Sequence, residues 1–551
     1  MPSPFVRIFL SIVLVFAIAR LAFAQGSGQV NTKAPAVTAP AGGCANAPSP
    51  TGEAAATLDT ALQKYRTGHF DTAVGGYESV IAAGDKAAAP YAYAGLARAN
   101  LKLHKVDEAY DAAQKANALT PNAPPAIVAL GEVYYRQGKF TEAEAAFRAP
   151  CTADARAYLG LSRIYEITSN YKSAKSSINA AHTLDPTDPD IGRAWVATLG
   201  GADRLKYLKE YLATPGNEDA AHREGLEHQL AVLEDEVSTP THSCKLVTKV
   251  TSTQTKFDPV GMDMDSRISG YGLPVKVNGA TANLQLDTGA SGIVLGRKMA
   301  QKANIKLITS ETLQGIGEGP AASGSIGVAD SIKIGDLEFQ GCYVDVVDRK
   351  SALEDDGLIG ADVFEDFLVD LDFPDAKFKL SPLPAIPDQP AKEASLQSET
   401  SSGAHLHDRY VPPEMKSYSQ VFRIGHALLI PTSVNETPYR LFLIDTGSFD
   451  DTVSPTMAKQ FTHITGDSNM TIKGFNGEVN KVYTADQLVL RFGRLKQDRH
   501  DLITFDVTNV SNSFGTEISG IFGFGMLRMI DMKIDYRDGL VDLEYDPHRF
   551  H

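Results

Sequence analysis

The chain has 551 residues, which is too long for one hydrophobic core, so several domains are expected. Its hydrophobic content of 43% and charged content of 22% are ordinary for globular domains. The formal net charge of -15 argues against a nucleic-acid partner, because binding phosphates needs a basic face.

Residues 1–24 have the pattern of a signal peptide. Arg7 precedes an apolar run from Ile8 to Ala19, and Ala22-Phe23-Ala24 supplies a small-x-small cleavage pattern. The apolar run is shorter than the about 20 residues that a membrane-spanning helix needs. We therefore expect a periplasmic or secreted protein without membrane contact after cleavage, with an uncleaved anchor as the alternative.

Residues 25–53 are rich in Ala, Pro and Gly and predict a flexible linker. The chain has four cysteines, and in an exported protein these can form disulfides. Their spacing fits neither a CxxC motif nor a zinc site, so we expect no metal and no cofactor. Three complete pairings remain open for these cysteines, which are Cys44, Cys151, Cys244 and Cys342.

Residues 54–236 predict a repeat of helix pairs with a period near 34 residues. A small residue recurs at the position where two helices would cross closely, at Ala73, Ala109, Ala143 and Ala174. An aromatic residue precedes it by three in three of the repeats, at Phe70, Phe140 and Tyr171. Gly68 and Gly138 fall at the predicted turns between paired helices, and Pro121 and Pro186 follow second helices. This pattern resembles the tetratricopeptide repeat, and residues 191–236 are expected to cap the array.

After about Ser238 the helical periodicity is replaced by the alternating apolar pattern of β-strands. We predict a linker at 237–269, a first β lobe at 270–382, an inter-lobe linker at 383–417 and a second lobe at 418–551. Each lobe contains an Asp-Thr-Gly triplet after an apolar strand, at Asp287-Thr288-Gly289-Ala290 and Asp445-Thr446-Gly447-Ser448.

The same ordered signals follow both triplets. A Gly-rich turn begins 28 or 29 residues later, and two apolar residues with a glycine follow, ending at Gly360 and Gly523. Similar closing strands come next, at Phe367–Phe373 and Ile530–Tyr536. The Gly-rich turns contain Gly315, Gly317, Gly474 and Gly477.

Residues 270–382 and 418–546 each resemble a retropepsin-like lobe of the aspartic peptidases, and together they resemble a single-chain, two-lobe member. The fold class expected is therefore an all-α helical-repeat domain followed by an all-β bilobal aspartic-peptidase fold. The resemblance implies that Asp287 and Asp445 are catalytic, that Gly360 and Gly523 lie behind their loops, and that the Gly-rich turns act as flaps.

Two carboxyl groups that share one proton supply both the base and the acid that peptide hydrolysis by water requires. Gly289 and Gly447 allow close approach of backbone, and Thr288 and Thr446 are expected to hydrogen-bond across the lobes. Ala290 and Ser448 differ, and a hydroxyl bond from Ser448 would make Asp445 the more acidic member.

We expect a monomeric aspartic endopeptidase that acts on a peptide or protein substrate, with the repeats recruiting a protein partner. A non-catalytic extracytoplasmic scaffold is the alternative. A third possibility is an enzyme whose active site forms between lobes of two different chains. Three other features are interpreted as turns or solvated loops: Gly315-Ile316-Gly317-Glu318-Gly319; His405 and His407; and Asp355-Asp356 with Asp450-Asp451.

Overall fold

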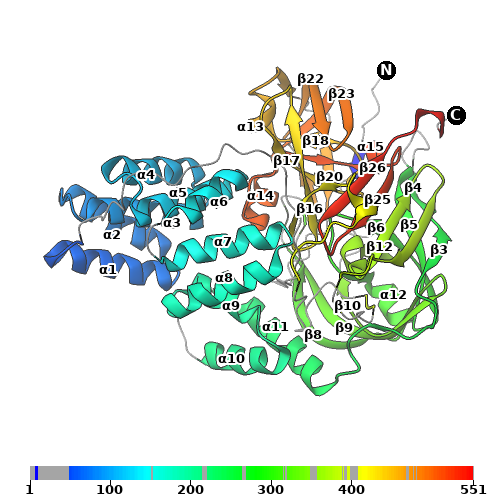
Figure 1. The fold of residues 1–551 in the computed structure, drawn as a ribbon. Helices are drawn as coiled ribbons and strands as arrows, with labels where there is room; N and C mark the ends of the chain where they lie inside the picture. Colours follow the sequence, from blue (N-terminus) through cyan, green and yellow to red (C-terminus); the bar gives the residue numbers. More distant parts are fainter. Residues whose placement is uncertain are drawn as a thin grey trace.

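The computed structural model of this protein describes residues 7–9, 49–150, 153–213, 220–262, 268–313, 315–316, 319, 321–347, 356–387, 389, 394–396, 407–466, 471–475, 477–479 and 481–549. Helices form one side of the molecule and β-sheets the other (Figure 1). The proposed cleavage site at Ala22-Phe23-Ala24 and the cysteines Cys44 and Cys151 lie outside the described residues. Within the described residues, no helix combines the length and the apolar character that crossing a membrane would require.

The helical part consists of successive antiparallel pairs, as the repeat predicts, and the expected fold class is confirmed. The helices are α1 (Gly52–Arg66), α2 (Phe70–Ala82), α3 (Ala89–Lys102), α4 (Val106–Leu119), α5 (Pro124–Arg136), α6 (Phe140–Arg148), α7 (Ala155–Ile167), α8 (Tyr171–Leu184), α9 (Pro189–Val196), α10 (Gly201–Ala213) and α11 (Ala220–Ser238).

The small residues of the repeat lie where the paired helices touch. Ala73, Ala109, Ala143 and Ala174 have no exposed surface, because a larger side chain there would push the backbones apart. Gly68 and Gly138 occupy the turns of their pairs with φ of 77° and 71°, a left-handed conformation that glycine adopts without steric cost.

The first lobe contains a mixed sheet in the order β2-β10-β7-β11-β6-β5-β9-β8, with β4 also paired to β5. Its strands are β2 (Lys245–Leu246), β4 (Asp258–Met262), β5 (Ile268–Val277), β6 (Ala280–Asp287), β7 (Ile293–Gly296), β8 (Lys306–Leu313), β9 (Ala322–Ile334), β10 (Leu337–Val347) and β11 (Gly357–Gly360). Helices α12 (Arg297–Lys302) and η1 (Ala361–Phe364) complete the lobe.

The second lobe repeats this plan in the order β15-β16-β17-β24-β18-β23-β22-β19. Its strands are β15 (Phe422–Ile424), β16 (Ala427–Val434), β17 (Arg440–Ile444), β18 (Thr452–Val453), β19 (Ile464–Gly466), β22 (Val482–Phe492), β23 (Leu495–Phe505) and β24 (Gly520–Phe522). A separate hairpin joins β20 (Thr471–Gly474) to β21 (Gly477–Val479), and β1 (Arg7–Phe9) pairs in parallel with β20. The short helices are η2 (Pro413–Met415), α13 (Pro455–Ala458), α14 (Thr508–Phe514), α15 (Phe524–Leu527) and η3 (Pro547–Arg549).

A third sheet, the interlobe sheet, takes strands from both lobes in the order β14-β26-β25-β12-β13-β3. These strands are β3 (Thr253–Lys256), β12 (Phe367–Asp372), β13 (Lys377–Pro382), β14 (Ser419–Gln420), β25 (Asp531–Asp535) and β26 (Leu540–Glu544). The two closing strands seen in the sequence, β12 and β25, are direct antiparallel neighbours, with Leu371 opposite Met532. The lobes therefore share a continuous backbone ladder.

The repeat domain packs against both lobes. The α5–α6 turn docks on lobe 2, where Thr516 Oγ1 donates to the Tyr135 carbonyl and Glu517 N donates to the Arg136 carbonyl, each at 2.9 Å. Helix α11 docks on lobe 1, where the Tyr343 hydroxyl donates to Asp235 Oδ2 at 2.7 Å. Apolar side chains of α5 to α7 form one core with those of lobe 2, so the repeats are not a loosely tethered appendage.

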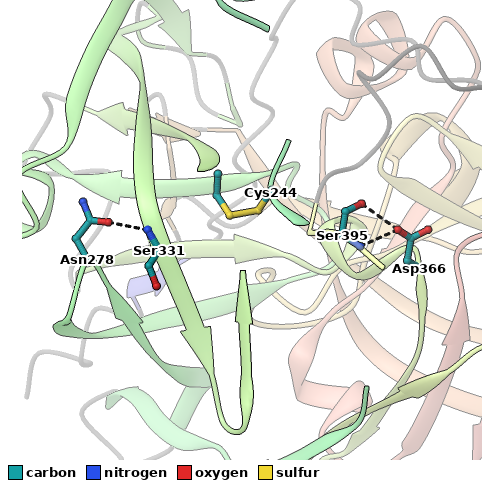
Figure 2. Close-up of a disulfide and its surroundings, with 6 residues drawn as sticks. Cys244, Asn278, Ser331, Asp366 and Ser395 are labelled. Carbon is teal, nitrogen blue, oxygen red and sulfur yellow. Dashed lines mark hydrogen bonds between the residues drawn. A yellow bond between two sulfur atoms is a disulfide. The ribbon is translucent and has the colours of Figure 1, made fainter. Parts of the chain in front are cut away.

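A buried disulfide between Cys244 and Cys342 closes a segment with a sequence separation of 98 (Figure 2). It fastens the chain entering lobe 1 to β10. The inter-lobe segment crosses at the same place, since Leu396 N donates to the Cys244 carbonyl. Ser395 is anchored there by two hydrogen bonds to Asp366 Oδ2, both at 2.9 Å.

The interpretation of His407 as part of a solvated loop is wrong. Its side chain is buried, with Nε2 3.9 Å from Asp538 Oδ1. The segment packs into lobe 2, where Tyr410 N donates to the same oxygen, Asp538 Oδ1, at 2.8 Å. His405 lies outside the described residues.

Candidate active site

The structure places the two Asp-Thr-Gly loops at equivalent points of the two lobes. Asp287 ends β6, and Asp445 directly follows β17. The strand ending at Gly360 runs parallel to β6 with Gly360 opposite Asp287, and β24 runs parallel to β17 with Phe522 opposite Ile444. Gly360 and Gly523 thus lie beside the loops, as the resemblance implies.

The two carboxyl groups, here called the dyad, meet at the lobe interface. Both side chains are fully buried, and they lie within hydrogen-bonding reach of each other. The backbone of Gly289 lies so close that an added Cβ would fall 2.5 Å from Asp445 Cγ. A residue other than glycine would therefore separate the dyad.

Backbone amides bind the inner oxygen of each carboxyl group. Gly289 N donates to Asp287 Oδ1 at 2.8 Å, and Gly447 N and Ser448 N donate to Asp445 Oδ1 at 2.9 and 3.1 Å. The Oδ2 atoms are also buried, but neither receives a hydrogen bond from an N–H or hydroxyl of the described residues.

The two threonines hold the loops together by crossing between lobes. Thr288 Oγ1 donates to the Ile444 carbonyl and Thr446 Oγ1 donates to the Leu286 carbonyl, each at 2.9 Å. Each hydroxyl also accepts the backbone N–H of the other threonine at 3.0 Å. All donors and acceptors of this crossing are buried, which makes the loop geometry rigid.

Burial raises the pKa values of both carboxyl groups. Removal from water, followed by the charge of Asp445, raises the pKa of Asp287 well above its ordinary range. Burial raises the pKa of Asp445 only to about 7, because Asp287 and the amides of Gly447 and Ser448 donate to it and favour its charged form.

The expected hydrogen bond from the Ser448 hydroxyl to Asp445 is not formed. The Ser448 hydroxyl donates to the Asp450 carbonyl at 3.1 Å, not to the carboxylate. It is the Ser448 backbone amide that binds Asp445 Oδ1. The Ser448 hydroxyl therefore gives no support to the predicted difference in acidity between the two aspartates.

Behind each loop lies a buried acidic residue that was missed or misread from the sequence. In lobe 1, Asp362 accepts from Ser291 Oγ at 2.8 Å and from Gly292 N at 3.1 Å. In lobe 2, Asp451 was interpreted as a solvated turn residue, yet it is buried and accepts from Gly523 N at 2.9 Å. The position of Asp362, two residues after Gly360, was the available signal.

The neighbouring Asp450 is half-buried and pairs with Arg499, whose guanidinium also binds Asp451 at 2.9 Å. Asp356, also interpreted as a solvated turn residue, accepts Asn283 N at 3.0 Å, while Asp355 lies outside the described residues. These carboxylates support loops and strands. No metal-like cluster of three His, Cys, Asp or Glu side chains occurs in the part of the chain that the structure describes.

The Gly-rich turns of the two lobes touch each other. A Cβ on Gly474, in the β20–β21 hairpin, would fall 2.0 Å from the Ile316 carbonyl oxygen, in the β8–β9 connection. Gly477 has φ of 110° and lies near Gly319. Gly315 lies in the β8–β9 connection, and Gly317 lies outside the described residues.

Two family models match parts of this chain. Residues 273–363 match the family model described as Aspartyl protease, and residues 155–188 match the model described as Tetratricopeptide repeat. The predicted combination of these two families is thereby confirmed. No curated protein sequence matches the chain. Among solved structures, an aspartic proteinase from Irpex lacteus is similar at 13% identity, over 54% of this chain and 98% of that chain, with a TM-score of 0.35.

Proposed function

We propose that this protein is an aspartic endopeptidase that hydrolyses peptide bonds with a water held by Asp287 and Asp445. The observation that carries the proposal is the pair of buried carboxyl groups, one from each lobe, in contact with each other. Their raised pKa values allow one proton to be shared between them near neutral pH.

In this proposal Asp445 is the base and Asp287 is the acid. The Asp445 carboxylate takes a proton from the water as its oxygen attacks the carbonyl carbon, and Asp287 gives its proton to the carbonyl oxygen. The resulting diol collapses when Asp445 protonates the leaving nitrogen and a diol hydroxyl returns its proton to Asp287. The C–N bond breaks, and the dyad regains its starting protonation state.

The substrate would bind as an extended strand. Support comes from β20, whose edge pairs in parallel with the backbone of Arg7–Phe9. This segment belongs to the predicted signal peptide, so its removal would leave the same edge to a substrate strand. Main-chain hydrogen bonds along such an edge provide affinity that does not depend on substrate sequence.

Export is part of the proposal. A buried disulfide joins Cys244 to Cys342, and such bonds persist in oxidising compartments. This supports a periplasmic or secreted protein that is released by removal of residues 1–24. Mass spectrometry of the mature protein would test this, with a new N-terminus at Gln25 as the expected result.

We assign recruitment of a protein partner or of the substrate protein to the repeat domain. Many charges on its first helices are already paired within the array. Glu132 accepts from Arg98 and Arg156, each at 2.7 Å, and Asp190 accepts from Lys102 at 2.6 Å. Residues outside this network would therefore recognise the partner.

The decisive experiment assays the mature protein on a peptide library between acidic and neutral pH, beside Asp287→Asn and Asp445→Asn. Asp330→Asn is the matched control, because this side chain lies exposed in lobe 1. We expect both dyad variants to lose hydrolysis while the control retains it. Absence of cleavage by the wild type under every condition would reject the proposal and favour the scaffold, and the mass in solution tests the expected monomer.

A further inference from the structure

One arginine of lobe 2 joins three segments of the β-rich half. Arg423, on β15, is only 6% exposed. Its Nε donates to the Gly425 carbonyl and its Nη1 donates to the Tyr536 carbonyl, each at 2.9 Å. Its Nη2 donates to Glu365 Oε2 of lobe 1 at 2.7 Å. A single planar group therefore connects the β15–β16 turn, the end of the closing strand β25 and the first lobe.

The lobe 1 end of this connection lies on the segment that supports the Asp287 loop. Glu365 is buried and directly follows η1, where its backbone N donates to the Asp362 carbonyl at 3.2 Å. The same η1 begins directly after Gly360, which lies opposite Asp287. The Asp362 side chain also accepts two hydrogen bonds from the loop that follows Asp287. A shift of Glu365 would therefore reach Asp287 through a short, hydrogen-bonded segment.

The repeat domain keeps this arginine away from water. Strand β15 packs against α7, and the Phe140 ring of α6 lies edge-on to the Phe422 ring at a centroid distance of 4.7 Å. Tyr171, the first residue of α8, is buried near the same cation. Burial raises the pKa of Tyr171 to about 12, and the positive charge of Arg423 opposes this rise. In such a dry environment each hydrogen bond of the guanidinium is stronger than it would be in water.

Stability alone does not account for a buried ion pair at this place. The cost of removing two charges from water offsets much of their attraction, so apolar residues of similar volume often give equal or greater stability. What a guanidinium supplies is geometry, because its N–H groups point in fixed directions within one plane. Three acceptors from three segments are thereby held at fixed relative positions.

We infer that Arg423 is a positioning residue whose three hydrogen bonds set the separation of the Asp287 and Asp445 carboxyl groups. This inference rests on the proposed function. The dyad takes one carboxyl group from each lobe, so its geometry depends on how the lobes are held together. A displaced carboxyl group lowers the rate of the chemical step, whereas the surfaces that bind the peptide stay in place.

The test removes both charges of the pair together, in the double variant Arg423→Met with Glu365→Gln. This avoids burying a carboxylate whose cation has been deleted, so the fold should be retained. We expect kcat for peptide hydrolysis to fall about ten- to hundred-fold while KM stays within about two-fold of the wild type. The matched control is Arg98→Met with Glu132→Gln, which removes another Arg–Glu pair at 2.7 Å that lies wholly within the repeat domain. The control should keep the wild-type kcat.

A second variant, Arg423→Lys, keeps a positive charge beside Glu365 but lacks the planar fork. Its kcat should also fall, with KM again unchanged, and it decides the question if the double variant shows no cooperative thermal unfolding. Wild-type kcat in a folded Arg423 variant, an equal decrease in the control, or a raised KM at unchanged kcat would overturn the inference.

Crystal structures of the wild type, the double variant and the control separate failure of this inference from failure of the proposed function. We expect the dyad carboxyl groups to move apart only in the double variant. If they do so while the wild type hydrolyses nothing, the peptidase proposal fails and the positioning by Arg423 stands. If the wild type hydrolyses peptides and the double variant keeps both the dyad geometry and kcat, the peptidase proposal stands and Arg423 only contributes to packing.

Discussion

Replacement of Thr288 by valine tests whether the crossed threonines hold the dyad together. Valine keeps the shape of the side chain but removes its hydroxyl. Two hydrogen bonds disappear, the one donated to the Ile444 carbonyl at 2.9 Å and the one accepted from Thr446 N at 3.0 Å. A carbonyl and an amide are then left buried without a partner.

An unsatisfied buried polar group costs about 1–3 kcal/mol, so the two groups predict a loss of roughly 2–6 kcal/mol. Thr446→Val removes the other two bonds of the crossing and should cost a similar amount. The double variant should lose less than the sum, because either single change already releases the loops from each other. Hydrolysis should fall in all three, since the carboxyl groups lose their fixed separation.

Urea unfolding, followed by near-ultraviolet circular dichroism, measures the loss, and peptide hydrolysis measures its effect on activity. Thr288→Ser keeps the hydroxyl and should stay within about 1 kcal/mol of the wild type. Thr432→Val is a second control, because this buried threonine donates only to Ile430 on its own strand. A cost for Thr288→Val no larger than that of Thr432→Val would refute the reasoning.

Three further outcomes are expected. Burial raises the pKa of Asp287 in the folded protein. Above about pH 4 the unfolded chain therefore releases the Asp287 proton while the folded protein keeps it, and the free energy of unfolding falls as the pH rises. Asp287→Asn should therefore raise the thermal midpoint at pH 8 but not at pH 4, and an equal effect at both would contradict this. Replacing Cys244 and Cys342 together by serine should lower the free energy of unfolding by about 3–5 kcal/mol, measured by chemical denaturation, because the unfolded chain is no longer constrained by a long loop. A decrease of less than about 1 kcal/mol would contradict this prediction. Gly138→Ala should lower the thermal midpoint more than Gly84→Ala, since both have positive φ but only Gly138 lies against Leu441.

The architecture was predictable because its signals are local and occur more than once. A small residue recurs at nearly constant spacing because the two helices of each pair cross closely at the same position. These residues are Ala73, Ala109, Ala143 and Ala174. The two Asp-Thr-Gly loops were found in the same way, each by its preceding strand and its following glycines. Where two backbones approach closely, only small residues fit. Such contacts can therefore be predicted from the residue types in the sequence.

Contacts between distant segments were not predictable. Burial of Asp451 and His407 depends on strands and turns far away in sequence, and both were misread as solvated because an acid or a histidine in a polar stretch is usually exposed. The partner of the Ser448 hydroxyl was likewise mispredicted, because its acceptor is a backbone carbonyl, which has no signature in the sequence.

By itself, the sequence determined the repeat, the two lobes and the identity of the two acidic residues, since each depends on periodicity or on a short motif. Only the tertiary structure decided that the repeats share a core with lobe 2, that Cys244 pairs with Cys342, and that Phe475 packs with apolar side chains of the opposite lobe. The physical reason is that these contacts form when two segments far apart in the sequence bury each other's surface from water. The residue pattern of either segment alone does not indicate which other segment will cover it.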